Sequence, residues 1–423
     1  GAGAALLESD REAVAIPSLT CDLDGDADVV RAELAQGREL MEGIDVRDPA
    51  FESWIREQRS RFAGEPVSEI RAQPPPLTVP FYVRMNELPP SFGRFVSLAL
   101  ADGIAGLVSE FASVDVYGAS GAAVQLGSQE RGIILTIESS EAHGQLHLLA
   151  QMTATRTGQL LWSRRAVLPL NQADVLMDGE FPSIVFEAAE TALTALPRVI
   201  GQDTTTLRAS ALVAKAVHEM FTFEAARLRL ADGYLREAAR IMPDARVYAW
   251  HSLLRQIMAI ERVDGDWARM NAEAEMFARK ALESAPNNPL VLSLVAQVQV
   301  MLLNSPEIGN ELAKVALRLN PNNAFAYAAR ASGLLRSNDH EGALQAAKMG
   351  SSLARRSGFQ HWWDSLAGLS SMIAGDNAAA IATYESSYAR APNFRPVLRH
   401  LLFLYLKTGQ EDKARGAFED LRR

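Results

Sequence analysis

The densest group of potential ligand side chains is an acidic run near the start of the sequence. Four aspartates alternate with other residues from Asp22 to Asp28, and Glu33 stands twelfth when Asp22 is counted as first. A calcium-binding loop places ligands at positions 1, 3, 5, 7 and 12, but it also needs glycine at position 6 for its sharp turn. Ala27 occupies that position. The pattern therefore favours an acidic connector over a calcium site, and we expect no bound metal.

Other reactive residue types lack the partners that catalysis needs. His143 and His147 flank an expected hairpin turn, but no carboxylate or cysteine joins them at a metal-ligand spacing. The segment that starts at Gly118 ends on Ala122, where a nucleophile elbow requires glycine. Acidic neighbours disfavour the reactive thiolate of Cys21. Phosphate-binding and dinucleotide-binding glycine patterns do not occur in the sequence. We therefore expect a protein that is not an enzyme, with no catalytic residue and no cofactor.

The composition is that of a globular protein. Of 423 residues, 48% are hydrophobic and 22% are charged, which excludes a disordered chain and a fibrous repeat. The single cysteine excludes an intrachain disulfide and suits a reducing compartment. Asp102, Glu110 and Asp115 interrupt the most apolar stretch, 95–116, so we expect no membrane span. The first residues lack the pattern of a signal peptide, and we expect a cytoplasmic protein.

Charge is distributed unevenly along the chain. The net charge of −9 combines −8 in residues 1–76, −6 in residues 77–203 and +5 in residues 204–423. The change of sign near residue 203 indicates two blocks with different surfaces. An acidic chain is a poor candidate for binding a phosphate backbone through its net field. The basic block predicts an acidic partner surface, and the acidic amino-terminal half of the same molecule is one candidate.

Residues 77–203 have the pattern of a small α/β domain. Prolines at 74–76 favour an extended linker over residues 66–76. A strand at 80–87 precedes a helix from Ser91 to Ala112, and four segments rich in β-branched residues follow before a final helix. Gly144-Gln145 and Thr157-Gly158 are expected hairpin turns. The order β-α-β-β-β-β-α predicts a small mixed α/β sandwich within an α+β multidomain chain.

Residues 204–423 have the periodicity of a helical repeat. Runs of 12–18 residues carry apolar side chains at helical spacing and are separated by short turns. Turn prolines stand at Pro286, Pro321 and Pro392, which are 35 and 71 residues apart, and an intermediate turn falls near Ser357. Small residues recur early in the second helix of each unit, at Ala343, Ala380 and Ala414. This period with two helices per unit is typical of tetratricopeptide repeats, so we expect an all-α tetratricopeptide-repeat solenoid.

Such a solenoid buries a core between neighbouring repeats and leaves a concave groove. The candidate partner-binding residues are groove-facing positions in the first helices of the repeats: Asn322, Tyr327, Arg330, Trp363, Arg395 and Arg399. They would bind a protein partner or a second copy of the chain. The alternative is that the array only packs against the other domains.

Two segments resemble known families. Residues 77–200, with LALADGIAGLVSEF and the hairpin HLLAQMTATRTGQLLWS, resemble the TolB amino-terminal-like domain, which has no established catalytic residues. The first 65 residues resemble the wing of a winged-helix domain and the start of the activator domain in SARP-type bacterial transcriptional activators. The matching residues are Asp22, Gly43, Asp45, Asp48, Pro49, Phe51, Glu52, Trp54, Ile55, Arg56 and Arg59. The resemblance implies that a DNA-reading helix would lie upstream of Gly1.

Together these features predict the non-catalytic regulatory portion of a cytoplasmic bacterial transcriptional regulator. The expected parts are a wing remnant and activator-domain start (1–65), a linker (66–76), a TolB-like α/β domain (77–203) and tetratricopeptide-like repeats (204–423). Its repeats would sense a signal, bind a protein partner or dimerise, and a small-molecule effector is possible. DNA would be contacted only through a domain upstream of Gly1, and no membrane is expected. The alternative is a stand-alone tetratricopeptide adaptor that scaffolds protein assembly without DNA binding.

Overall fold

The computed structural model describes residues 8–9, 14–15, 79–119, 132–170, 175–176, 180–200, 205–263 and 265–422. The chain divides into two units, Gly1–Pro74 and Pro75–Arg423. In the first unit, β1 (Glu8–Ser9) pairs antiparallel with β2 (Val14–Ala15), in the segment whose resemblance implies the wing of a winged-helix domain. The acidic run from Asp22, the thiol of Cys21, the activator-domain pattern of 22–59 and the linker 66–76 lie outside the described residues.

A five-stranded mixed sheet opens the second unit. Its strands are β3 (Val79–Met85), β4 (Val114–Ala119), β5 (Ile133–Ala142), β6 (Gln145–Ala154) and β7 (Leu160–Pro169), in the spatial order β4-β3-β5-β6-β7. β3 runs parallel to both β4 and β5, and the remaining neighbours are antiparallel. The first hairpin turn lies at His143-Gly144, one residue before the predicted position. Both residues have positive φ angles, 53° and 72°, as in a type I′ turn.

Two helices, α3 (Phe92–Phe111) and α4 (Glu180–Ile200), pack against the sheet. Ser91 begins α3, because its side chain accepts a hydrogen bond from the amide of Arg94. By length and composition α3 is the one helix among the described residues that could cross a membrane. In this fold its apolar side packs into the core, where Leu100 and Ile104 are 0% exposed. We call strands β3–β7 with α3 and α4 the sheet layer.

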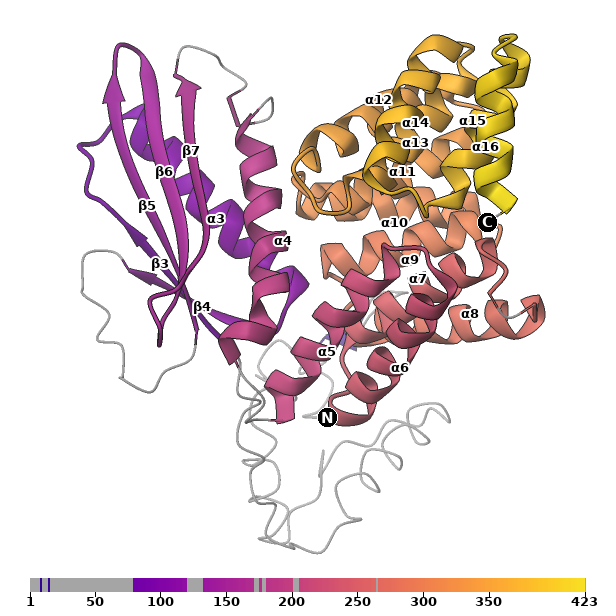
Figure 1. Cartoon of the computed structure of the whole chain (residues 1–423). Coiled ribbons are helices and arrows are strands. Elements are labelled where there is room, and N and C mark those ends of the chain that lie inside the picture. The colour runs from indigo at the N-terminus through magenta and orange to yellow at the C-terminus, as the bar shows by residue number, and fades with distance from the viewer. Residues whose placement is uncertain are drawn as a thin grey trace, which may run out of the picture. The chain divides into compact units, whose positions relative to one another are not determined.

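Twelve helices from the described residues then follow in antiparallel pairs, and we call them the helical array. They are α5 (Thr205–Met220), α6 (Ala225–Ile241), α7 (Ala245–Ile260), α8 (Trp267–Ser284), α9 (Pro289–Met301), α10 (Pro306–Leu319), α11 (Ala324–Arg336), α12 (His340–Leu353), α13 (Gln360–Ile373), α14 (Asn377–Arg390), α15 (Arg395–Lys407) and α16 (Glu411–Arg422). Figure 1 shows the pairs stacked beside the sheet layer. The fold class is therefore the predicted one, a small mixed α/β part followed by an all-α solenoid.

The repeat spacing sets the turns of the array. Pro286, Pro321, Ser357 and Pro392 each lie between two helix pairs, as the 35-residue period predicts. The small residues at Ala343 and Ala380 are 0% exposed, and Ala414 is 3% exposed, so they lie at close helix contacts. Asparagine and aspartate side chains cap helices in these repeats, and those of Asn288, Asn323, Asp339 and Asp376 accept backbone hydrogen bonds.

One hydrophobic core runs through both layers of the second unit. One reason lies in α4, whose buried apolar residues spread over more than one side of the helix: Phe181, Ile184, Val185, Phe186, Ala188, Ala189, Ala192, Leu193, Ala195 and Leu196. An apolar surface this wide needs packing partners in more than one direction. Here β7 lies against one side of α4, and α5 and α12 lie against others (Figure 1).

Candidate functional site at the junction of the two layers

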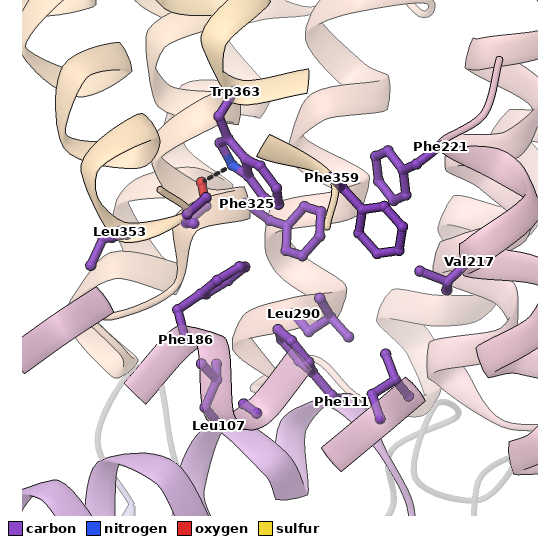
Figure 2. Packing of buried hydrophobic residues seen from close by; sticks show 14 of the residues in the cluster. Leu107, Phe111, Phe186, Val217, Phe221, Leu290, Phe325, Leu353, Phe359 and Trp363 are labelled. Carbon is purple, nitrogen blue, oxygen red and sulfur yellow. Dashed lines mark hydrogen bonds between the residues drawn. The ribbon is translucent and has the colours of Figure 1, made fainter. Parts of the chain in front are cut away.

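Aromatic rings from both layers meet where the sheet layer contacts the helical array. The ring of Phe325 on α11 lies 6.1 Å, between centroids, from the rings of Phe111 and Phe186 of the sheet layer. Trp363 on α13 packs edge-on against Phe186 at 5.4 Å, and its indole N–H donates to the carbonyl of Ala324 at 3.1 Å. Figure 2 shows these rings pointing toward one another from the two layers. The array thus already holds a protein surface of its own chain.

The turn between α5 and α6 extends this aromatic cluster toward later repeats. Phe221 stacks on Phe359 with centroids 4.6 Å apart, and Phe223 lies 4.2 Å from Phe394. The carbonyl of Phe221 lies 2.8 Å from Nε2 of His361. Because a carbonyl only accepts, Nε2 carries the hydrogen. Burial lowers the pKa of His361, which keeps the ring neutral.

Polar contacts surround the end of α3. Nδ2 of Asn320 donates to the Glu110 carboxylate at 2.5 Å, and Nδ2 of Asn288 donates to the Glu110 carbonyl at 3.4 Å. Arg246 of α7 bonds to the Ser113 hydroxyl just beyond the helix. The second carboxylate oxygen of Glu110, Oε2, is buried without a hydrogen-bond partner. Burial raises the pKa of Glu110 to about 8, although the Asn320 amide acts in the opposite direction.

Two consecutive arginines of the array contact α4. Nε of Arg355 donates to the Ser183 hydroxyl at 3.1 Å. Arg356 lies 3.1 Å from the Glu180 carboxylate and 3.9 Å from that of Glu187. Such pairs join a cation of the basic block to anions of the acidic block, as the charge asymmetry predicts. They lie at the edge of an interface whose centre is aromatic.

A second buried carboxylate lies on α4. Oγ of Ser357 donates to Glu190 at 2.9 Å, and the Glu190 residue is 9% exposed. Burial raises the pKa of Glu190 to about 7, against the lowering effect of the Ser357 hydroxyl and the Gly358 amide. The neighbouring Glu187 carboxylate raises it further.

A buried ion cluster joins α6, α7 and α8. Asp232 accepts from Nε2 of His251 at 2.8 Å and from Arg255 at 2.7 Å, and Arg255 also bonds Glu273 at 2.5 Å. Burial acts to raise the pKa of Asp232, but the bonds to His251 and Arg255 lower it to about 2. The His251 ring stacks on Phe277 at 4.0 Å. This histidine–aspartate pair links α7 to α6 within the helical array.

The six candidate partner-binding residues do not form one surface. Trp363 is 1% exposed and lies in the core rather than on a free groove, because the sheet layer covers this side of α13. Asn322 is half-buried beside Gly103 of α3, at the junction. Tyr327 is half-buried in a small cluster with residues of α11, α12 and α13, and burial raises its pKa. Arg330 is half-buried and lies near Glu311 of α10, whose pKa it helps to lower.

Arg395 and Arg399 do lie together, both exposed on α15. Arg399 is 3.4 Å from the carboxylate of Glu261 at the end of α7. Burial raises the pKa of Glu261, and the charges of Arg399 and Arg395 partly offset that rise. Farther along α15, Phe403 is 53% exposed and Leu406 is 62% exposed. The spacing of these four α15 residues places them on one face of the helix.

Sequence reasoning missed Glu110, Phe111, Phe186, Glu190 and Phe325, the residues that form the junction. The available signal was the sequence of α4, whose apolar residues spread over more than one side of the helix and therefore need more than one packing partner. That pattern indicates burial, but it does not name the residues of the array that provide it.

An open hollow of about 830 Å³ lies on the sheet layer, lined in part by Glu138, His147, Arg165 and Glu180. The carboxylate of Glu180 is already engaged by Arg164 at 2.6 Å. Within the described ranges, no group of three or more His, Cys, Asp or Glu side chains could hold a metal ion. The hollow therefore presents polar side chains without a recognisable catalytic arrangement.

Comparisons with known proteins point to fold alone. No protein-family model matches the chain, and no curated protein matches it. Among solved structures, MamA is 22% identical with a TM-score of 0.30, covering 38% of this chain and 90% of that one. PilW, described as a type IV pilus biogenesis factor, is 16% identical with a TM-score of 0.36, covering 51% and 92%. The Cut9–Hcn1 complex is 14% identical with a TM-score of 0.43, covering 60% and 46%. These are tetratricopeptide-repeat proteins, and scores this low carry no argument about function.

Proposed function

We propose that this chain is a non-catalytic, cytoplasmic scaffold that binds protein partners through its helical array. One observation carries the proposal: the array already holds a protein surface, that of its own sheet layer. Phe325 and Trp363 form an aromatic centre there, and polar contacts such as Asn320–Glu110 and Arg356–Glu180 surround it. Protein interfaces have this anatomy of buried aromatic anchors inside a polar rim.

The surface we assign to an external partner is the exposed face of α15. Arg395 and Arg399 supply positive charge, and Phe403 and Leu406 supply exposed apolar area on the same face. Charge complementarity then favours a protein segment with acidic residues beside apolar ones. The other four candidates are less suited to this role, because packing within the chain buries Trp363 and half-buries Asn322, Tyr327 and Arg330.

Site-specific photo-crosslinking in the source cells tests this assignment. A photoreactive phenylalanine analogue at Leu406 should give discrete covalent adducts with another protein, identified by mass spectrometry. The same analogue at Arg279, an exposed position on α8, is the matched control and should give few. Phe403→Ala, which removes an exposed ring of the same face, should strongly reduce the Leu406 adducts while the melting temperature is kept. Adducts that are equal at both positions, or that are unchanged in Phe403→Ala, would exclude this face as the partner site.

The second candidate is the regulatory portion of a transcriptional regulator of the SARP type. The antiparallel pair of β1 and β2 supports it, with Glu8 opposite Ala15 where a wing hairpin is expected. In that case the TolB-like part and the repeats would control a DNA-binding domain. The coding sequence upstream of Gly1 distinguishes the two candidates. An in-frame winged helix there favours the regulator, and its absence leaves the adaptor.

A further inference from the structure

Two buried glutamate side chains of the sheet layer accept hydrogen bonds from the array, and in each case the donor is uncharged. Glu110 and Glu190 both belong to the sheet layer. Their partners in the array are the Asn320 amide at 2.5 Å and the Ser357 hydroxyl at 2.9 Å. Across the described part of the chain, no ion pair includes either carboxylate. Burying an ionised carboxylate without a cation is expensive, so a neutral, protonated carboxyl fits these places better.

The array has cations at this junction, but they contact other groups. Arg246 pairs with Asp244 at 2.6 Å and bonds the Ser113 hydroxyl. Arg355 bonds the Ser183 hydroxyl, and Arg356 pairs with acidic residues at other positions of α4. The two carboxylates therefore have only uncharged hydrogen-bond partners, although arginines lie at the same junction.

Other titratable groups near these carboxylates do not neutralise them. The charge closest to Glu190 on its own helix is that of Glu187, which repels it. On the α5 side, His218 lies near Phe359, with ring centroids 6.5 Å apart. On the α13 side, His361 is bonded to the Phe221 carbonyl and is kept neutral by burial. Around Glu110, the Asp244–Arg246 pair of α7 carries no net charge.

We propose that closing the junction between the sheet layer and the helical array takes up protons at Glu110 and Glu190, so that acid tightens this contact and base loosens it. The proposal is independent of the partner surface on α15. It makes access to the aromatic centre around Phe325 a function of pH. Opening would expose rings that are buried in the closed chain, and it would ionise both carboxyls in water.

The direction of this pH dependence follows from the pKa difference of each glutamate between the closed and the open state. Burial raises the pKa from 4.5 to about 8 for Glu110 and to about 7 for Glu190. The protonated closed state is therefore favoured most fully below about pH 4.5. Its advantage declines as pH rises and is gone above about 7 for Glu190 and about 8 for Glu110. Between pH 6 and pH 8 the equilibrium constant for opening should rise about 500-fold, about 50-fold from Glu110 and about 10-fold from Glu190.

Hydrogen exchange of the whole chain, corrected for intrinsic rates and followed by mass spectrometry at pH 6 and pH 8, tests the proposal. Peptides covering the end of α3, α4 and the turns before α11 and α13 should show the large rise in opening. The double variant Glu110→Gln/Glu190→Gln carries permanently neutral side chains of the same shape and should hold the junction closed at both pH values. Asp102→Asn replaces an exposed carboxylate of α3 and should behave as the wild type.

Two results would overturn the proposal. In one, junction peptides of the wild type change no more with pH than those of α16. In the other, the double glutamine variant keeps the wild-type pH dependence. If that variant fails to fold, infrared spectroscopy of the wild type decides independently. The band of protonated carboxyl groups should persist at pH 6, where ordinary glutamates are ionised, and its absence there would reject the idea.

Discussion

Gly368 of α13 lies directly against the ring of Tyr384 in α14, so a Cβ on Gly368 would stand 2.7 Å from Cε1 of that ring. Tyr384 is 0% exposed, and its ring also stacks on His400 at 5.1 Å between centroids. The ring therefore has little freedom to move away. Glycine inside a helix is normally unfavourable relative to alanine, and here it allows the two helices of one repeat to approach.

Gly368→Ala should lower the free energy of unfolding by about 1–2 kcal/mol. Overpacking against the ring costs about 1–3 kcal/mol, and the better helix propensity of alanine returns about 0.5–1 kcal/mol. Gly233→Ala is the matched control, because that helical glycine on α6 has nothing within 4 Å of its added Cβ. The control should be stabilised by about 0.5–1 kcal/mol. Urea denaturation compares them, and equal shifts for both variants would contradict the steric explanation.

Arg255→Ala should destabilise the chain strongly, by about 3–5 kcal/mol, because it removes the buried cation that Asp232 and Glu273 share. The Arg255 side chain is only 2% exposed. Arg236 also pairs with Asp232, at 2.9 Å, but its side chain is 63% exposed. Arg236→Ala should therefore change stability by less than about 1 kcal/mol. Chemical denaturation of both variants measures the difference, and similar losses would show that burial does not decide the strength of these pairs.

Acid should weaken the fold through Asp232. Its pKa falls from 3.8 to about 2 in the folded chain, so the stabilisation is present above about pH 3.8 and lost as pH falls toward 2. The loss from this residue should be about 2 kcal/mol. Asp232→Asn should be less stable at neutral pH and should show a shallower decline over this range. Denaturation series at pH 2–5 check this, and parallel curves for wild type and variant would contradict it.

Phe186→Ala should lower the free energy of unfolding by about 3–5 kcal/mol, because it empties a fully buried site. The same core runs through both layers, so the loss should appear in both, within one thermal transition. Phe403→Ala removes a ring that is 53% exposed and should have a small effect. Calorimetry measures the number of thermal transitions, and hydrogen exchange shows which layer loses stability. Two resolved transitions, with the array unaffected by the Phe186 change, would show that the layers unfold independently.

The parts of the fold that the sequence predicts correctly depend on signals between residues close together in the chain. Ser91 begins α3, and the turn prolines and small residues of the repeats set the helix pairs, because each signal acts within a few residues of its partner. The hairpin at His143-Gly144 differs by one residue from its prediction, since the sequence does not show that His143 itself takes a positive φ angle.

The junction could not be predicted in the same way. Glu110 and Asn320 are 210 residues apart, and Ser357 and Glu190 are 167 apart. Which faces meet over such distances depends on the rotation of each helix around its axis. Trp363 illustrates this, because the α13 sequence carries two adjacent tryptophans, and periodicity alone did not indicate which one faces the sheet layer.

Helix α4 packs against both the sheet and the repeats. This shared packing limits where the chain can be cut into stable fragments. The change of charge and pattern near residue 203 marks a boundary in sequence, but we propose that it is not a boundary in folding. A fragment beginning at Thr205 would lack the sheet layer and would expose the side chains of Phe221, Phe325 and Trp363 to water. A fragment ending at Ile200 would expose the array-facing side of α4. Each piece would be prone to aggregate, because both would expose apolar side chains that the whole chain buries.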